Sequence, residues 1–198
     1  MPNASPDQHI RTDRIWNWNS AANGFTTLLP VRDEDILTGV FTADGTPKAW
    51  DTRPQVMPGI ERVKKKQHPL GDLSFVMGAS VVLNEKAHAA LRGFLDPFGQ
   101  FLELDMVDET GIGGGDQRLY FYNVTNVIRC IDFDRSETEG KKVIKPAFVP
   151  DSIPASAQVF KDPLRKKMDI YLNQAAHAEL SRLMTEAGLR GSTLTRMF

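Results

Sequence analysis

The sequence predicts an α+β fold, with a mixed, mostly antiparallel sheet, two pseudo-repeated strand-helix units and an irregular N-terminal segment. Three observations lead to this fold class: a strand, asparagine and helix pattern that occurs twice, a central series of short strands, and a first third rich in Pro, Gly, Asp and Asn. The length of 198 residues favours one structural unit. We therefore expect residues 1–67 to pack as an irregular segment on an α+β domain of residues 68–198.

The internal repeat is the most informative pattern. Residues 81–91 (VVLNEKAHAAL) match residues 170–180 (IYLNQAAHAEL) at six of eleven positions. In each copy an apolar run precedes an asparagine, Asn84 or Asn173, and asparagine is a preferred residue for capping a helix N-terminus. The repeat predicts helices up to Leu95 and Ala187, packed as a pair on one mixed sheet, with apolar faces buried. The residues expected to be buried are Ala87, Leu91, Ala176, Leu180 and Leu183.

The strands of the sheet follow from the alternation of apolar and polar residues. We expect one buried strand within residues 73–83 and a half-exposed strand at 101–107, with further strands at 118–124 and 127–133. Together they predict an antiparallel meander. Residues 141–163 contain four prolines and predict a wandering connection. Residues 168–172 predict a last strand, and a short tail is expected after the second helix.

Composition excludes several classes of protein. The net charge of −1 argues against general nucleic-acid binding, which needs a basic excess on one face. The N-terminus has neither the basic start nor the apolar stretch of a secretory signal, and no run is long enough to span a membrane, so a cytoplasmic location is expected. The single cysteine, Cys130, lies in an apolar run and is expected to pack as a small hydrophobic residue.

No motif predicts a catalytic residue, a cofactor or a metal site. His88 and His177 lack a second histidine or cysteine at helical spacing, so packing is the better interpretation. The glycine-rich run 111–116 lacks the last glycine and the following helix of a dinucleotide-binding loop. The acid pairs 103/105 and 132/134 could in principle hold a metal ion or exchange protons. A metal-dependent enzyme that uses this acidic strand face therefore stays an alternative.

Charge is segregated along the chain. Residues 96–139 carry ten acids and three bases, whereas residues 161–198 carry seven bases and four acids. Such segregation is compatible with a binding face and equally with solvated hairpin loops. If it marks a binding face, the acidic residues expected to contact a partner are Glu103, Asp105, Asp108, Glu109 and Asp116.

Residues 50–192 resemble a family of bacterial polymorphic-toxin immunity proteins, the eleventh such immunity family. The resemblance is carried by core positions and turn signals: PLGDL with Phe75, VVLN before the first helix, FLEL, LYFYNV, CID with Ser136, and IYLN before the last helix. The resemblance implies a cytoplasmic protein that neutralises a cognate toxin or secreted effector by occlusion. It supplies no active site, and it says nothing of the oligomeric state. An adaptor protein with no toxin partner is the other alternative.

Overall fold

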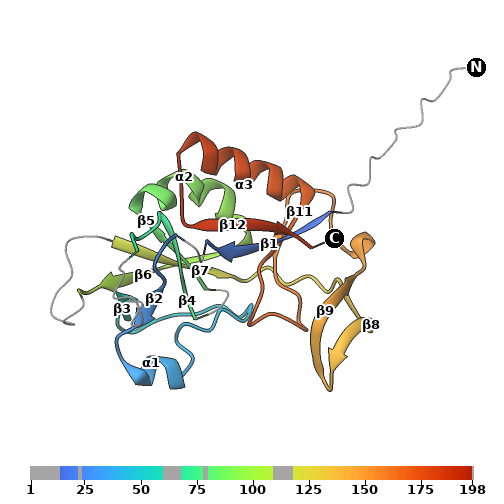
Figure 1. The fold of residues 1–198 in the computed structure, drawn as a ribbon, viewed down its shortest axis with the longest axis horizontal. Helices are drawn as coiled ribbons and strands as arrows, with labels where there is room; N and C mark the ends of the chain where they lie inside the picture. Colours follow the sequence, from blue (N-terminus) through green and yellow to red (C-terminus); the bar gives the residue numbers. More distant parts are fainter. Residues whose placement is uncertain (1–13, 22–23, 60–67, 78–79, 109–117, 198) are drawn as a thin grey trace, which may run out of the picture.

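The computed structural model describes residues 14–21, 24–59, 68–77, 80–108 and 118–197. These residues confirm the α+β class, with strands that are mostly antiparallel (Figure 1). The helices of the described residues are α1 (Asp33–Leu37), α2 (Glu85–Leu95) and α3 (Gln174–Glu186), with 3-10 turns at Asp96–Phe98 and Pro150–Ser152. The strands form a closed barrel, a four-stranded sheet and a two-stranded ribbon rather than the single sheet that the repeat suggested.

The barrel is formed mainly by the central strands. Its order is β2 (Leu28–Pro30), β3 (Gln55–Pro58), β6 (Gly99–Met106), β7 (Arg118–Val124), β5 (Ser80–Asn84) and β4 (Leu73–Val76). β2 pairs with β4 and β3 pairs with β6 in parallel, and the remaining neighbours are antiparallel. Val56, Val82, Leu104 and Phe121 belong to one buried cluster with Phe41. β2 pairs with β4 at one residue pair and β3 pairs with β6 at two, so the barrel is closed by two short contacts.

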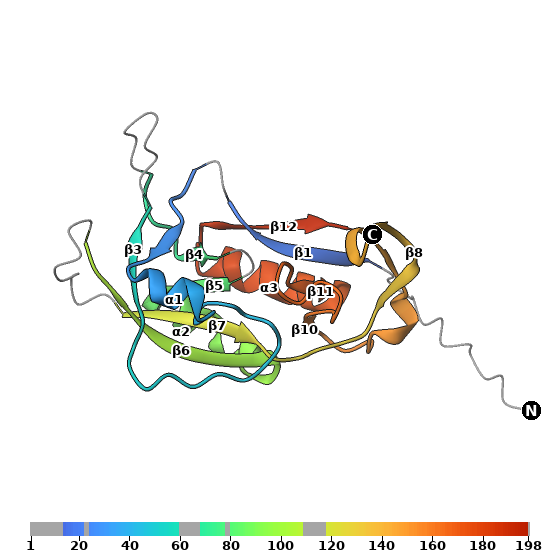
Figure 2. The ribbon, with the colours of Figure 1, turned by 90° about the horizontal axis from the view of Figure 1, so that it is seen from below.

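The four-stranded sheet has the order β10 (Val159–Phe160), β11 (Tyr171–Asn173), β1 (Ile15–Ser20) and β12 (Ser192–Arg196). All three pairs are antiparallel, and β12 lies at one edge of the sheet, beside β1 (Figure 2). The remaining strands, β8 (Ile131–Glu139) and β9 (Lys142–Phe148), pair only with each other and project from the body.

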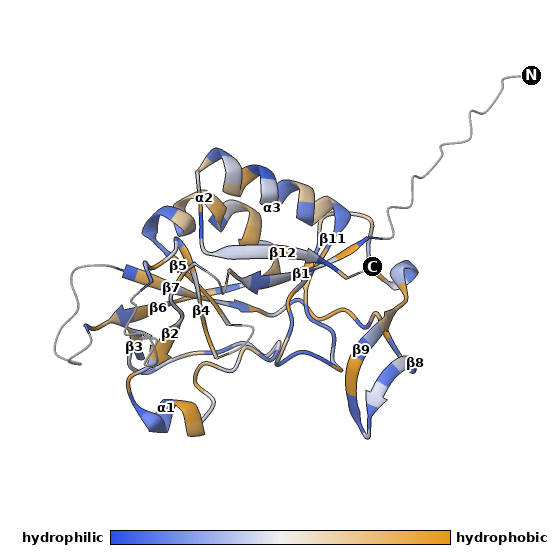
Figure 3. Cartoon of the chain, viewed as in Figure 1, coloured by the Kyte–Doolittle hydropathy of each residue, from blue (hydrophilic) through white to orange (hydrophobic). Residues whose placement is uncertain are grey.

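Helices α2 and α3 share one hydrophobic core with strands of both larger sheets. Ala87, Leu91, Ala176 and Leu180 have no exposed surface, which confirms four of the five predicted buried positions. Leu183 is partly buried and packs against the same core. Each helix alternates hydrophobic and hydrophilic residues (Figure 3), as expected of a helix with one buried face.

The two predicted caps are confirmed. Asn84 Oδ1 accepts a hydrogen bond of 2.8 Å from Ala87 N, and Asn173 Oδ1 accepts one of 3.0 Å from Ala176 N. The two asparagines have φ values of −78° and −79° and ψ values of 176° and 175°. Local sequence therefore produces the same helix start twice.

The N-terminal segment is richer in strands than predicted. β1 lies in the middle of the four-stranded sheet, and β2 and β3 complete the barrel with strands from beyond residue 67. β1 carries no simple alternation, because the side chain of Asn17 is buried and donates a 2.8 Å hydrogen bond to Asp169. A strand of this kind is stabilised by partners that are distant in sequence, so its own residues give little signal.

Residues 127–163 also differ from the prediction. Val127 forms only an isolated bridge with Lys161, and β8 begins at Ile131. The predicted connection contains β9, which includes Pro146, and β10. A two-stranded ribbon has only edge strands, and an edge strand tolerates a proline because one side of it forms no ladder hydrogen bonds. Where a short tail is expected after α3, the structure has strand β12.

Candidate functional site

The acidic strand proposed as a binding face is β6, and the fold brings arginines to it. Arg53 forms ion pairs with Glu103 and, at 3.8 Å, with Asp105. Asp105 also lies directly opposite Arg118 in the β6–β7 register. Glu103 and Asp105 are partly exposed. Their charge is balanced by Arg53, which is distant in sequence, and by Arg118 on the neighbouring strand β7.

The other acids of the negative segment are dispersed. Asp108 is exposed just after β6, while Glu109 and Asp116, like the glycine-rich run, lie outside the described residues. On the β8–β9 ribbon, Glu137 pairs in register with Lys145 and Glu139 with Lys142. Segregation along the chain is therefore partly cancelled in space, because antiparallel pairing places acidic and basic strands side by side.

The acid pair 132/134 has a structural explanation. Asp132 Oδ1 accepts hydrogen bonds from the backbone N–H groups of Asp134 and Arg135, at 3.0 and 3.2 Å. This local bonding is common where an Asp side chain stabilises a turn or an irregular strand. Within the described ranges, no three His, Cys, Asp or Glu side chains come close enough to hold a metal ion.

The two repeat histidines each stack on an aromatic ring. His88 lies 3.8 Å from Tyr120 between ring centroids, and His177 lies 3.7 Å from Trp16, with interplanar angles of 9° and 12°. Burial lowers the pKa of both imidazoles. The neutral form that burial favours is the form that packs against a ring as an apolar surface.

A buried polar cluster that no sequence motif predicted lies beside β11. Lys161 is fully buried and donates hydrogen bonds to the backbone oxygens of Lys166 and Asp169, at 2.9 and 3.2 Å. Burial lowers the pKa of its ammonium group to about 7. The carboxylate of Asp169 accepts hydrogen bonds from Asn17, Arg165 and Tyr171.

Asp162 completes this cluster. It is buried and accepts hydrogen bonds from the backbone N–H groups of Cys130, Ile131 and Leu164, at 2.7 to 2.9 Å. Cys130 is 1% exposed, as predicted, and burial raises the pKa of its thiol. The cluster uses its polar atoms to hold the loop between β10 and β11 and the start of β8. The only sequence signal for it is a Lys-Asp pair directly after the apolar residues of β10.

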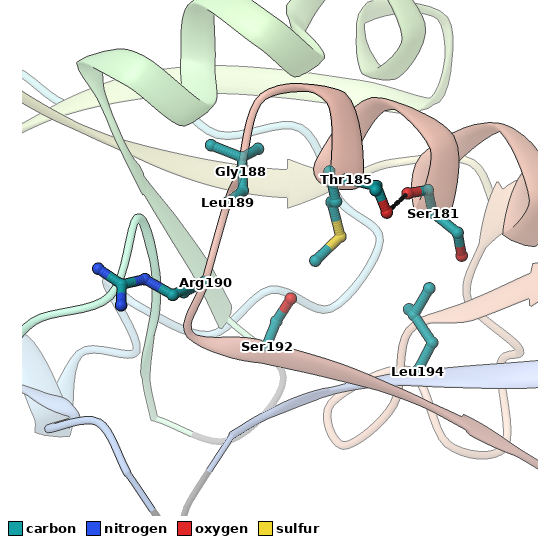
Figure 4. A pocket seen from close by; sticks show the side chains of 8 residues that line it. Ser181, Thr185, Gly188, Leu189, Arg190, Ser192 and Leu194 are labelled. Atoms are coloured by element: carbon teal, nitrogen blue, oxygen red, sulfur yellow. Dashed lines mark hydrogen bonds between the residues drawn. The ribbon is translucent and has the colours of Figure 1, made fainter.

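A groove of about 420 Å³ lies between α3 and the edge strand β12 (Figure 4). Met184, Leu189 and Leu194 give it an apolar lining, and Ser181, Thr185, Gly188, Arg190 and Ser192 complete it. The hydroxyl group of Thr185 donates a hydrogen bond of 2.8 Å to the backbone oxygen of Ser181. Ser192 Oγ is buried and has no hydrogen-bond partner among the described residues.

The strand beside this groove has a free edge. β1 occupies one side of β12, and no described strand pairs with the other side. An unpaired edge presents backbone donors and acceptors to any chain that can align with it. The groove and this edge of β12 adjoin one another, and we name this surface the α3–β12 groove.

A scan against models of known protein families finds no match for this chain, and a search of curated proteins finds none either. Among the described residues, no helix is both long enough and apolar enough to cross a membrane.

Proposed function

We propose that this chain is an immunity protein that binds a cognate toxin or secreted effector in the cytoplasm and neutralises it by occlusion. The observation that carries the proposal is the α3–β12 groove, where an apolar lining adjoins a serine hydroxyl and a strand edge that have no partner among the described residues. This combination suits recognition of another polypeptide, because backbone hydrogen bonds supply affinity and a side-chain pocket supplies selectivity. The role as an immunity protein rests on the resemblance described above.

The experiment uses the products of the genes that neighbour this one. Each product is expressed alone in a bacterial host to find one that arrests growth, and the growth arrest is then challenged by co-expression of this chain. We expect growth to be restored and the two purified proteins to form a complex of defined stoichiometry. If no neighbouring product is toxic, or if the toxic one is not neutralised, the proposal is wrong.

A titration of purified toxin separates occlusion from the two alternatives. An occluding protein abolishes toxin activity at one equivalent, because each molecule covers one target. A metal-dependent enzyme that inactivates the toxin would act at far below one equivalent and would stop when the metal is chelated. An adaptor would bind its partner and leave its activity unchanged.

A further inference from the structure

Resting on the proposed binding function, we infer that the α3–β12 groove receives an aromatic side chain of the partner protein. This side chain would take the place that the ring of Phe101 takes in the other repeat of the chain. The internal repeat, which extends in space beyond the two matching sequence segments, identifies this occupant.

The two repeats have the same arrangement of four strands. In the first repeat the strand order is β4–β5–β7–β6, and in the second it is β10–β11–β1–β12, with every neighbouring pair antiparallel. A helix follows the second strand of each order, α2 after β5 and α3 after β11. In the second repeat, β1 therefore occupies the place that β7 occupies in the first.

The strand register shows which residues are equivalent. Tyr120 on β7 lies opposite Leu83, the residue before the first helix cap. Trp16 on β1 lies opposite Leu172, the residue before the second helix cap. In both repeats the histidine of the following helix stacks on this aromatic ring. Tyr120 and Trp16 are therefore equivalent positions, and the next residues on the same strand faces correspond as well.

The next pair on these faces differs between the repeats. In the first repeat, Tyr122 lies opposite Phe101 of β6. In the second, Trp18 lies opposite Leu194 of β12. The ring of Phe101 reaches α2, because its centroid lies 4.8 Å from the ring centroids of both Tyr122 and His88. Leu194 has no ring, and the α3–β12 groove lies at this position in the second repeat.

A second difference between the repeats points the same way. Gly99 of β6 lies opposite Val124, and Ser192 of β12 lies opposite the equivalent Ser20. A Cβ atom on Gly99 would lie 2.9 Å from the Tyr122 ring, so the first repeat has no room for a side chain there. The second repeat has room for Ser192, whose buried hydroxyl group has no partner among the described residues. This hydroxyl group can bond a polar atom beside the bound ring.

The groove has the size and the lining that an aromatic ring needs. Leu194 points from β12 towards Ser181 of α3 (Figure 4), and Met184 and Leu189 complete the apolar lining. An apolar cavity of about 150 Å³ is enough to bind benzene, and the groove measures about 420 Å³. Aromatic side chains held in such pockets carry much of the binding energy of protein interfaces. A ring from the partner would bury apolar surface here as Phe101 does in the first repeat.

The test uses the full chain and a display library of random linear peptides. Peptides selected on the parent are synthesised, and their affinities are compared for the parent, Leu194→Phe and Leu29→Phe. Leu194→Phe introduces the residue of the equivalent position in the first repeat, and Leu29→Phe makes the same change on an exposed strand position. We expect the selected peptides to share a Phe, Tyr or Trp. Leu194→Phe should weaken their binding by about tenfold or more, while Leu29→Phe binds like the parent.

Further measurements locate the ring in the groove. Replacing the shared aromatic residue of a selected peptide by Ala should weaken binding to the parent by about tenfold or more. Addition of the peptide should shift the methyl NMR signals of Met184, Leu189 and Leu194. Ser181→Phe fills the groove from its opposite wall and should block the peptide as Leu194→Phe does.

Thermal unfolding tests the equivalence of the two positions. Leu194→Phe should keep or raise the unfolding temperature, because the added ring fills the groove. Phe101→Leu should lower it, because the smaller side chain leaves a gap between β6 and α2. A strongly destabilised Leu194→Phe would show that the groove does not correspond to the site of the Phe101 ring.

Four other outcomes would overturn the inference: selected peptides without a shared aromatic residue, affinities that Leu194→Phe leaves unchanged, a dimer of this chain that Leu194→Phe dissolves, or peptide binding that occurs only in Phe198→Ala. The last two would assign the groove to a second copy or to the last residue of the chain. If the parent and Leu194→Phe neutralise a toxin equally well, the proposed function stands and this inference fails. If aromatic peptides bind the groove but no neighbouring toxin is neutralised, the inference stands and the proposed function fails.

Discussion

Gly71 and Gly191 lie back to back where the barrel meets the four-stranded sheet. A Cβ atom on Gly71 would lie 2.6 Å from Gly191 Cα, and one on Gly191 would lie 2.0 Å from the backbone oxygen of Leu73. Gly191 also has a φ of +113°, a conformation that other residues rarely adopt. Next to the two glycines, Leu73 N donates a hydrogen bond of 3.0 Å to Arg190 O, which extends this junction between the barrel and the four-stranded sheet.

The junction gives the first prediction. Gly191→Ala should strongly destabilise the protein, because both the backbone conformation and the space forbid a Cβ atom. Gly93→Ala is the matched control, since it lies in α2 with nothing within 4 Å of a new Cβ. It should raise the free energy of unfolding by about 0.5–1 kcal/mol. Urea denaturation of both variants measures the difference, and similar midpoints would contradict the described junction.

The shared helical core gives the second prediction. Leu91→Ala and Leu180→Ala should each lower the free energy of unfolding by about 2–5 kcal/mol, because each removes a fully buried side chain and leaves a cavity. Leu37→Ala is the control, since Leu37 is 86% exposed. Chemical denaturation should place the control within about 0.5 kcal/mol of the parent. Parent-like stability of both core variants would show that these helix faces are not buried.

The two caps are predicted to differ in cost. Asn84 makes its cap bond and donates to Asp72 at 3.1 Å, whereas Asn173 also accepts from Gln158 and donates to the backbone oxygens of Pro154 and Ser156. Asn84→Ala should cost about 1 kcal/mol, and Asn173→Ala more, since it also removes the hydrogen bonds to Gln158 N and to the backbone oxygens of Pro154 and Ser156. Serine should restore most of the stability at position 84 only. Equal rescue at both positions, measured by thermal unfolding, would argue against the additional bonds.

Lys161 predicts a pH dependence of stability. Its pKa is about 7 in the folded protein because it is buried, whereas an unfolded chain retains a lysine pKa of about 10.4. Between these values the unfolded state binds more protons, so the free energy of unfolding contributed by Lys161 rises with pH, by up to about 1.4 kcal/mol per pH unit. Asp169 and Asp44 oppose the shift without removing it.

The measurement compares the parent with Lys161→Met by chemical denaturation between about pH 6 and 9. The stability of the parent relative to the variant should increase above about pH 7. Below this pH it should be constant, because Lys161 is protonated in both the folded and the unfolded protein. The hydrogen bonds lost in Lys161→Met change the stability difference between parent and variant by a constant amount, so they do not affect how that difference varies with pH. A difference that is independent of pH would mean that Lys161 stays charged when buried.

The acidic strand gives the last prediction, which concerns association with the proposed toxin. Changing Asp105, Asp108 and Glu109 together to Asn, Asn and Gln should slow association and reduce its salt dependence, because charge steering raises association rates from about 10⁵ towards 10⁸ per molar per second at low salt. Arg53→Gln should have the opposite effect, because it releases the charges of Glu103 and Asp105. Association rates are measured for both variants at two ionic strengths. Unchanged rates would show that β6 is not part of the proposed toxin-binding surface.

The sequence by itself determined the features that depend on neighbouring residues. The sequence predicts helices α2 and α3 and their asparagine caps, because a cap and its N–H partner are three residues apart and an apolar face repeats every three or four residues. The burial of Cys130 followed equally from its apolar neighbours.

Only the tertiary structure decided the features that depend on distant residues. Closure of the barrel needs β2 and β3, the acids of β6 meet Arg53, and the tail after α3 becomes the edge strand β12 beside β1. The sequence predicted the acidic strand and gave no sign of the α3–β12 groove, since its two walls acquire a common opening only after β12 has paired with β1. Strand pairing, ion pairing and groove shape are set by contacts across the chain, and no local period records them.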